Sequence, residues 1–171
     1  METWDAIRAR RKVGTYDARP ITDSDLERIL EAGRRSPSSR NEQRWAFVVV
    51  RDRSRLERLA HVWRGAAHIA DAAAAIAVVA PHDDDPRINA SINFDLGQAV
   101  STMMIAATDL GVGARHASVH DWQLGAEILD LPDDQRLTWL VGLGYPADRP
   151  LEPLLRPDRR PFDEVVHWDH W

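Results

Sequence analysis

The sequence contains no cysteine among its 171 residues. Disulfides, thiolate nucleophiles, zinc–thiolate centres and iron–sulfur clusters are therefore excluded, because each of them needs a cysteine sulfur. No apolar run reaches the roughly 18 residues that a membrane-spanning helix requires. The opening METWDAIRARRK is amphipathic and charged, unlike a secretory signal. We therefore expect a cytoplasmic protein that does not insert into a membrane.

Lysine is nearly absent, and acidic residues outnumber basic ones by 27 to 22. The formal net charge is −5, which argues against a general nucleic-acid-binding protein, since such proteins are usually basic. Lys12 is the only lysine, and the other 21 cationic side chains are arginines. Codon bias in a GC-rich genome would account for the arginines; alternatively, Lys12 was kept because its compact ammonium serves a local role.

The composition that remains is that of one globular domain. Hydrophobic residues make up 44% of the chain and charged residues 29%, at a length typical of a single domain. We expect residues 1–171 to form one domain, with a proline-rich C-terminal arm over about 146–171 that lies on the body or on a partner subunit.

Hydrophobic periodicity predicts alternating helices and strands. Thr22 and Asp25 predict the start of a helix, with Thr22 as its N-cap. In the first helix we expect Ile7 to face inward, with Trp4 as a second candidate for that face. The run at 74–80 is apolar throughout and predicts a strand buried on both faces. The predicted helices are 3–11, 22–35, 54–63, 65–72, 88–110 and 121–129, and the predicted strands are 45–50, 74–80, 114–119 and 137–143.

Two separated groups of basic residues could bind an anion. The first, Arg8, Arg10, Arg11 and Lys12, ends the first helix, where cations also complement the helix dipole. Its functional interpretation is an anion cradle, because arginine supplies a planar fork for phosphate and lysine a point charge. The second group lies in the arm and consists of Arg156, Arg159 and Arg160.

The loop 36–43, SPSSRNEQ, places many short donors and acceptors between a helix and a strand. It is either an ordinary turn rich in serine and asparagine or a loop that binds the edge of a heterocycle through hydrogen bonds. The seven histidines do not predict a metal site, since His116 and His120 would need a helix to act as a pair four residues apart. A serine triad is not expected, because no GxSxG elbow is present.

The order of these pieces resembles the FMN-dependent nitroreductase family along nearly the whole chain. The segment AIRARRKVGTYDARPITDSDLERILEAGRRSPSSRNEQRWAFVVVRD resembles the start of the family. The glycine-broken DLGVGARHASVH resembles its turn after the long helix, LVGLGYPADRP its strand with a Gly-Tyr-Pro ending, and RRPFDEVVHWDHW its C-terminus.

The resemblance implies an α+β fold: a homodimeric α-β-α sandwich with a mixed sheet flanked by helices and two FMN sites at the interface. Arg10, Arg11 and Lys12 would approach the flavin phosphate and ribityl chain, and Arg159 and Arg160 would close on the phosphate. The partner subunit would supply Pro37, Ser38, Ser39 and Asn41 near the edge of the ring. Gln43 would line the ring from its own loop, and Ala117 and Ser118 would lie close to the N5 side.

Four positions depart from the pattern of the family. Lys12 replaces a serine, Gly14 an arginine or lysine, and Arg44 the proline before Trp45, while Thr102 stands where the long helix usually carries asparagine. The cation lost at position 14 is roughly balanced by the one gained at position 12.

The resemblance implies a flavin oxidoreductase. Hydride would pass from NAD(P)H through the flavin N5 to a nitroaromatic, quinone or enone acceptor in a ping-pong sequence. The flavin carries this chemistry, so we expect no catalytic acid or base and no metal. The alternatives are a non-catalytic flavin store or sensor on the same fold, and a flavin-free structural protein. Neither a nucleic acid nor a membrane is expected as a partner.

Overall fold

The computed structural model describes residues 1–171, and its centre is a four-stranded sheet in the order β1-β2-β4-β3. The strands span Ala46–Val50 (β1), Ala74–Pro81 (β2), Gly113–Ser118 (β3) and Gln135–Gly144 (β4). All three pairings are antiparallel, so the expectation of a mixed sheet was wrong. The one parallel pairing is an isolated bridge between Lys12 and Ala114 outside the sheet. β1 and β3 therefore form the two edges.

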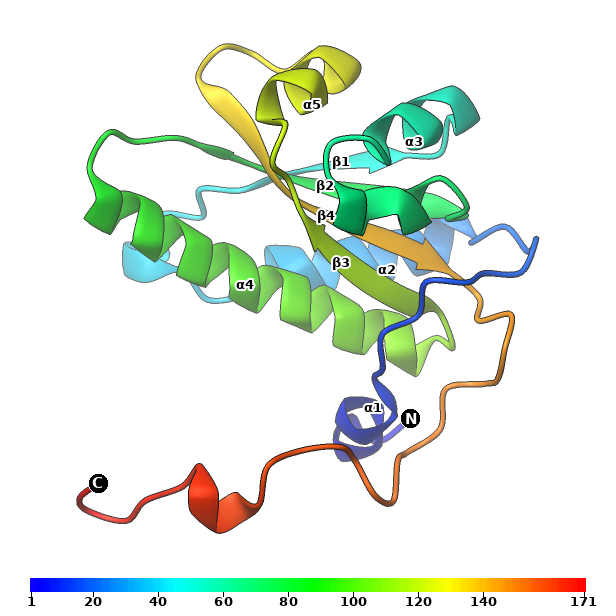
Figure 1. Ribbon diagram of the computed structural model, residues 1–171, viewed down its shortest axis with the longest axis vertical. Coiled ribbons are helices and arrows are strands. Elements are labelled where there is room, and N and C mark those ends of the chain that lie inside the picture. Colours follow the sequence, from blue (N-terminus) through cyan, green and yellow to red (C-terminus); the bar gives the residue numbers. More distant parts are fainter.

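Helices cover both faces of the sheet, and an α-β-α sandwich results (Figure 1). On one face, α2 (Asp23–Arg34) and the long α4 (Pro86–Asp109) pack against one set of strand side chains. On the other face lie α3 (Arg53–Leu59), the 3-10 helix η2 (Arg64–Ile69) and α5 (Trp122–Leu129). Alternate residues of β2 enter the two cores, which confirms the prediction of a strand buried on both faces.

The predicted helix starts and ends hold in most places. The Thr22 hydroxyl accepts a hydrogen bond from the Asp25 N–H at 3.1 Å, as the capping pattern predicts. The segment after α3 differs in kind, because residues 64–69 form a 3-10 helix. None of the helices combines the length and the apolar character needed to cross a membrane.

The short first helix, α1 (Thr3–Ala9), faces the opposite way from the prediction. Ala6 and Ala9 are buried, whereas Trp4 is 66% exposed and Ile7 is also exposed. α1 contacts α4, and the small alanine side chains allow the two backbones to approach closely. Hydrophobicity alone therefore selected the wrong side of this helix.

The chain after β4 runs back along the N-terminal segment before it leaves the body. Three backbone hydrogen bonds join the two segments: Asp17 N–H to Tyr145 O at 2.9 Å, Ala147 N–H to Thr15 O at 3.2 Å, and Leu154 N–H to Arg8 O at 3.1 Å. Beyond them the arm extends away from the sandwich and includes the short 3-10 helix η3 (Phe162–Glu164) (Figure 1). Its terminal Trp168 and Trp171 are 76% and 98% exposed.

Candidate functional site

A cavity of about 370 Å³ lies along the free edge of β3. The extended segment after α1 begins this edge, since the Val13 N–H donates to the Ala114 carbonyl at 3.3 Å. Backbone groups alternate in direction along a strand, so His116 and Ser118 present their N–H and C=O groups to the same free side. The lining residues are Arg10, Lys12, Trp63, Gly65, Met104, Arg115, His116, Ala117, Ser118 and Trp139.

A second cavity of about 270 Å³ adjoins the first and extends it toward α4. The two share Arg10, Met104, His116 and Trp139, and the second adds Gly97, Val100 and Ser101. The Trp139 indole N–H is buried and has no hydrogen-bond partner. A buried donor of this kind is costly unless a partner is supplied.

The charge of the first cavity is entirely positive. Arg10, Lys12 and Arg115 line it, no carboxylate does, and none of the three has an ion-pair partner. Burial, reinforced by these three cations, holds the pKa of His116 below its ordinary value. The His116 imidazole is therefore neutral around pH 7, and the cavity is prepared for an anion.

Arg11 lies next to Lys12 in sequence but does not line this cavity. Its Nη2 donates to Asp148 Oδ1 and to the Arg149 carbonyl, both at 2.7 Å. The bond from Arg11 is the main cause that lowers the pKa of the Asp148 carboxyl. Arg11 thus ties the N-terminal segment to the start of the arm, and its neighbours Arg10 and Lys12 face the cavity.

The serine-rich loop 36–43 lies apart from the cavity beside β3. Arg40, Asn41 and Gln43 have positive φ angles of 53°, 59° and 50°, a conformation that costs energy outside glycine. The buried Asp95 of α4 accepts a hydrogen bond from the Ser39 N–H at 3.0 Å, and Ser38 Oγ accepts one from the Gln43 N–H at 3.0 Å. The loop is therefore held in a strained shape.

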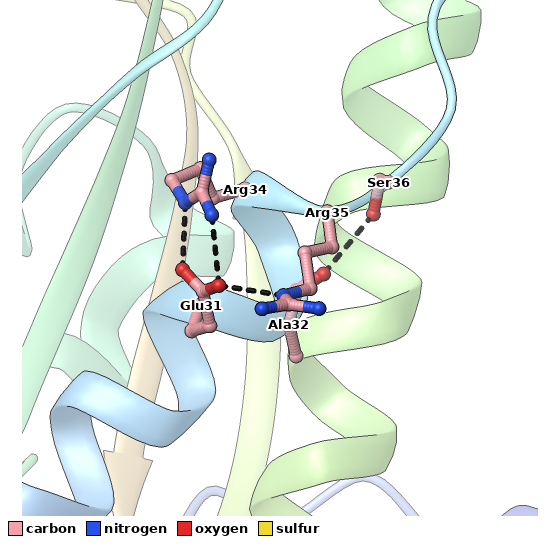
Figure 2. A network of polar contacts seen from close by, with 5 residues as sticks. All are labelled: Glu31, Ala32, Arg34, Arg35 and Ser36. Carbon is pink, nitrogen blue, oxygen red and sulfur yellow. Dashed lines mark hydrogen bonds and ion pairs between the residues drawn. The ribbon is translucent and has the colours of Figure 1, made fainter.

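The end of α2 fixes where this loop begins. Figure 2 shows Arg34 and Arg35 converging on the Glu31 carboxylate, with the Ser36 hydroxyl donating to the Ala32 carbonyl at 3.4 Å. The two guanidinium groups lower the pKa of Glu31 to about 2. This network orders the last turn of the helix, from which the loop departs.

Apart from Arg11, the predicted site residues fall into three places within one chain. Arg10, Lys12, Ala117 and Ser118 meet at the cavity beside β3. None of the loop residues Pro37, Ser38, Ser39, Asn41 and Gln43 lines it; Gln43 instead borders an open depression beside α2 and β1. Arg159 and Arg160 lie exposed on the arm, where Arg160 pairs with Glu164 at 3.2 Å.

Sequence reasoning missed several residues of the cavity, notably Arg115, Trp63 and Trp139. Arg115 lay inside a quoted motif, yet nothing in its spacing distinguished it from a surface arginine. Trp63 stacks on His120 with ring centroids 3.6 Å apart. His116 belongs to β3 rather than to a helix, and no group of three potential metal-binding side chains gathers in the structure.

Comparison with solved structures agrees with this architecture. An NADH dehydrogenase/NAD(P)H nitroreductase from Parabacteroides distasonis, provisionally so named, superposes with a TM-score of 0.85 at 25% identity, covering 100% of this chain and 99% of that one. An FMN-dependent nitroreductase from Clostridium difficile shares the fold with a TM-score of 0.84 at 22% identity, covering 97% and 98% of the two chains.

Sequence comparison then assigns the family. The model of the Nitroreductase family matches residues 7–82 and 55–145. A protein of Archaeoglobus fulgidus, provisionally named NADH dehydrogenase/NAD(P)H nitroreductase, is 32% identical over 174 residues, which cover 96% of each chain. The chain belongs to the Nitroreductase family and is an oxidoreductase of that family.

Proposed function

We propose that the protein is an FMN-dependent oxidoreductase that takes hydride from NAD(P)H and passes it to a nitroaromatic, quinone or enone. The observation that carries this proposal is the cavity beside β3, where three unpaired cations meet two tryptophans and a free strand edge. FMN needs such a combination, because it joins an anionic phosphate to a flat heterocycle rimmed with hydrogen-bonding groups.

The residues of the cavity fit this cofactor. Arg10 and Lys12 would hold the phosphate, while Ala117 and Ser118 of β3 would lie close to the ring. Bound FMN would supply hydride transfer at its N5 atom. Names of relatives support this choice, since one is provisionally named an NAD(P)H nitroreductase and another is described as FMN-dependent.

The chain itself would bind and orient rather than exchange protons. His116 is the titratable side chain of the cavity that lies nearest neutrality, and its lowered pKa keeps it uncharged there. It serves as a neutral polar wall beside Trp139, whose ring centroid lies 5.7 Å away. No general acid or base is therefore assigned. The open cavity would allow the hydride donor and the hydride acceptor to bind in turn.

The proposal includes a homodimer. In such a dimer Pro37, Ser38, Ser39 and Asn41 would reach the cavity of the partner subunit, Gln43 would line the ring from its own loop, and Arg159 and Arg160 of the arm would close on a phosphate. Exposed apolar side chains support this assembly, because large apolar side chains left in water favour an interface. Eleven large hydrophobic side chains are exposed, and eight of them lie on α1, α4 and the arm: Trp4, Ile7, Phe94, Leu155, Phe162, Val165, Trp168 and Trp171.

Steady-state turnover tests the function directly. The purified protein should be yellow, and it should oxidise NADH or NADPH when a nitroaromatic or a quinone is present. A yellow protein without turnover would instead support a flavin store or sensor. A colourless protein that does not take up added FMN would contradict both.

Two adjacent substitutions test the phosphate assignment. Lys12→Ala should weaken FMN binding by about 1–3 kcal/mol, as expected for loss of a charge-assisted bond. Arg11→Ala removes the same charge but mainly loosens the arm, because Arg11 pairs with Asp148. Riboflavin, which lacks the phosphate, should bind weakly to the wild type and respond little to Lys12→Ala. Equal FMN affinity in Lys12→Ala and wild type would refute the assignment.

A further inference from the structure

Arg115 differs from most arginines of this protein in having no polar partner. Thirteen arginines form an ion pair with a carboxylate, but the Arg115 guanidinium forms no ion pair and donates no hydrogen bond. Its side chain is nevertheless half-buried and lines the cavity beside β3. A half-buried cation without a counter-charge is unfavourable unless a ligand supplies the anion.

The surroundings of Arg115 contain no hidden anion. Tyr16 lies close enough for the guanidinium to affect its pKa, but burial raises that pKa and its hydroxyl donates to the Val13 carbonyl at 3.0 Å. His68, whose Nε2 lies 3.0 Å from the Arg115 carbonyl oxygen, has its pKa lowered by burial. Both neighbours are neutral around pH 7, so they leave the positive charge uncompensated.

Gly14 determines where the guanidinium can lie. A Cβ atom at position 14 would stand 2.8 Å from Arg115 Nη1 and 3.3 Å from its Cδ. Any larger residue at position 14 would therefore displace the end of this side chain. The same adjacency means that a long side chain at position 14 could bring its own charge to the place that Arg115 now occupies.

We infer that Arg115 is the third cation of the cofactor site, and that glycine at position 14 makes room for its guanidinium. This inference rests on the proposed function, because it takes FMN as the ligand. Arg10 and Lys12 approach from the segment after α1, whereas Arg115 approaches from β3. Arg115 binds an anionic oxygen of the flavin, either on the phosphate or on the ring.

The test measures FMN and riboflavin dissociation constants by quenching of flavin fluorescence, with no turnover required. Arg115→Gln should weaken FMN binding about 10- to 100-fold, as loss of one charge-assisted bond predicts. Gly14→Ala should weaken it in the same direction without removing a charge, because the new methyl group displaces the guanidinium. The clash is with the end of a flexible side chain, so we expect this variant to fold.

A lysine at position 14 would restore the positive charge from the segment after α1, which makes the test specific for charge at this place. The double variant Gly14→Lys with Arg115→Gln should recover most of the lost FMN affinity. Arg136→Ala is the matched control, since Arg136 also lacks an ion pair but stacks on Trp122, away from the cavity. Its FMN dissociation constant should stay within about twofold of the wild-type value, because it removes an equal charge outside the site.

The outcomes separate this inference from the proposed function. Wild-type protein that binds no FMN would contradict the function itself. Wild-type binding that Arg115→Gln leaves unchanged would overturn the role of Arg115 alone, as would a failure of Gly14→Lys to restore affinity. A loss limited to FMN assigns the guanidinium to the phosphate, and an equal loss for riboflavin assigns it to the ring; either supports the inference.

Discussion

Neighbouring side chains of the same charge have different surroundings in this protein. Arg11 and Lys12 follow each other in an extended segment, whose side chains alternate between opposite sides. Lys12 therefore faces the cavity beside β3, while Arg11 binds Asp148 and the Arg149 carbonyl. The basic run that looks uniform in sequence is divided by backbone geometry into a ligand-facing part and a structural part.

Asn41 offers a test of whether the strained loop binds flavin. Its φ of 59° is one that asparagine tolerates and alanine does not. If its amide binds the flavin of the partner subunit, Asn41→Ala and Asn41→Gly should both lower the reduction potential and the FMN occupancy, because preorganised donors stabilise charge on the reduced ring. The midpoint potential, normalised to bound FMN, provides the measurement.

Stability measurements separate the effect of backbone strain from the loss of the Asn41 amide. Asn41→Ala should lose about 1 kcal/mol of folding free energy through backbone strain, and Asn41→Gly should lose less. Glu42→Gln, at an exposed neighbouring position, should leave the potential nearly unchanged. An unshifted potential in both Asn41 variants would mean that this side chain only shapes the turn.

Strands and helices place the cavity through the edge that they leave open. β2 and β4 are paired on both sides, so their backbone groups are satisfied within the sheet. β3 is an edge strand, and the segment after α1 covers only its beginning through the bridge at Ala114. The remaining edge keeps free donors and acceptors, which a flat polar ring can use.

The close contact between α2 and α4 yields a stability prediction. A Cβ atom added at Gly33 would stand 2.7 Å from Met103 Cγ and 2.8 Å from its sulfur, and Met103 is fully buried. Gly33→Ala should therefore destabilise the protein by about 1–3 kcal/mol, even though alanine favours helices more than glycine does. Urea unfolding followed by circular dichroism measures the change.

The double variant Gly33→Ala with Met103→Ala serves as the control. Shortening Met103 alone leaves a cavity, and the methyl group at position 33 would partly fill it. The double variant should therefore lose less stability than the sum of the two single changes. Simple additivity, or a stabilising Gly33→Ala, would show that the two helices are farther apart than the structure has them.

Seen as a whole, the molecule leaves eleven large hydrophobic side chains exposed outside its two cores. The arm extends from the sandwich (Figure 1). Its tryptophans Trp168 and Trp171 are largely exposed. α1 turns Trp4 and Ile7 outward as well. One chain cannot cover these side chains with its own residues in this arrangement, which is why we propose that a second copy does.

Truncation of the arm tests the dimer. Removing residues 155–171 deletes its exposed apolar side chains but keeps Leu151, which is buried, and the Leu154 bond to Arg8. We expect monomers or aggregates with reduced FMN content, measured by light scattering after size-exclusion chromatography. Trp171→Ser in the full-length chain is the milder control. A truncated protein that stays a flavin-loaded dimer would rule out a role for the arm in assembly.

The sequence alone determined the order and most of the bounds of the secondary structure. Thr22 predicted the start of α2, and the apolar run at 74–80 predicted the central strand. Apolar residues at spacings of three and four in 88–110 predicted the long helix. These features depend on interactions within a few residues, so local patterns are enough to find them. The resemblance of the motifs pointed to the family, which the family model then matched.

Only the tertiary structure decided which side chains share a cavity. Arg115 lies beside Gly14 although about a hundred residues of sequence separate them, and Arg11 binds Asp148 near the other end of the chain. The antiparallel course of every strand pair and the outward turn of Trp4 and Ile7 were settled in the same way. Contacts between distant segments depend on how the layers pack, and no local pattern in the sequence carries that information.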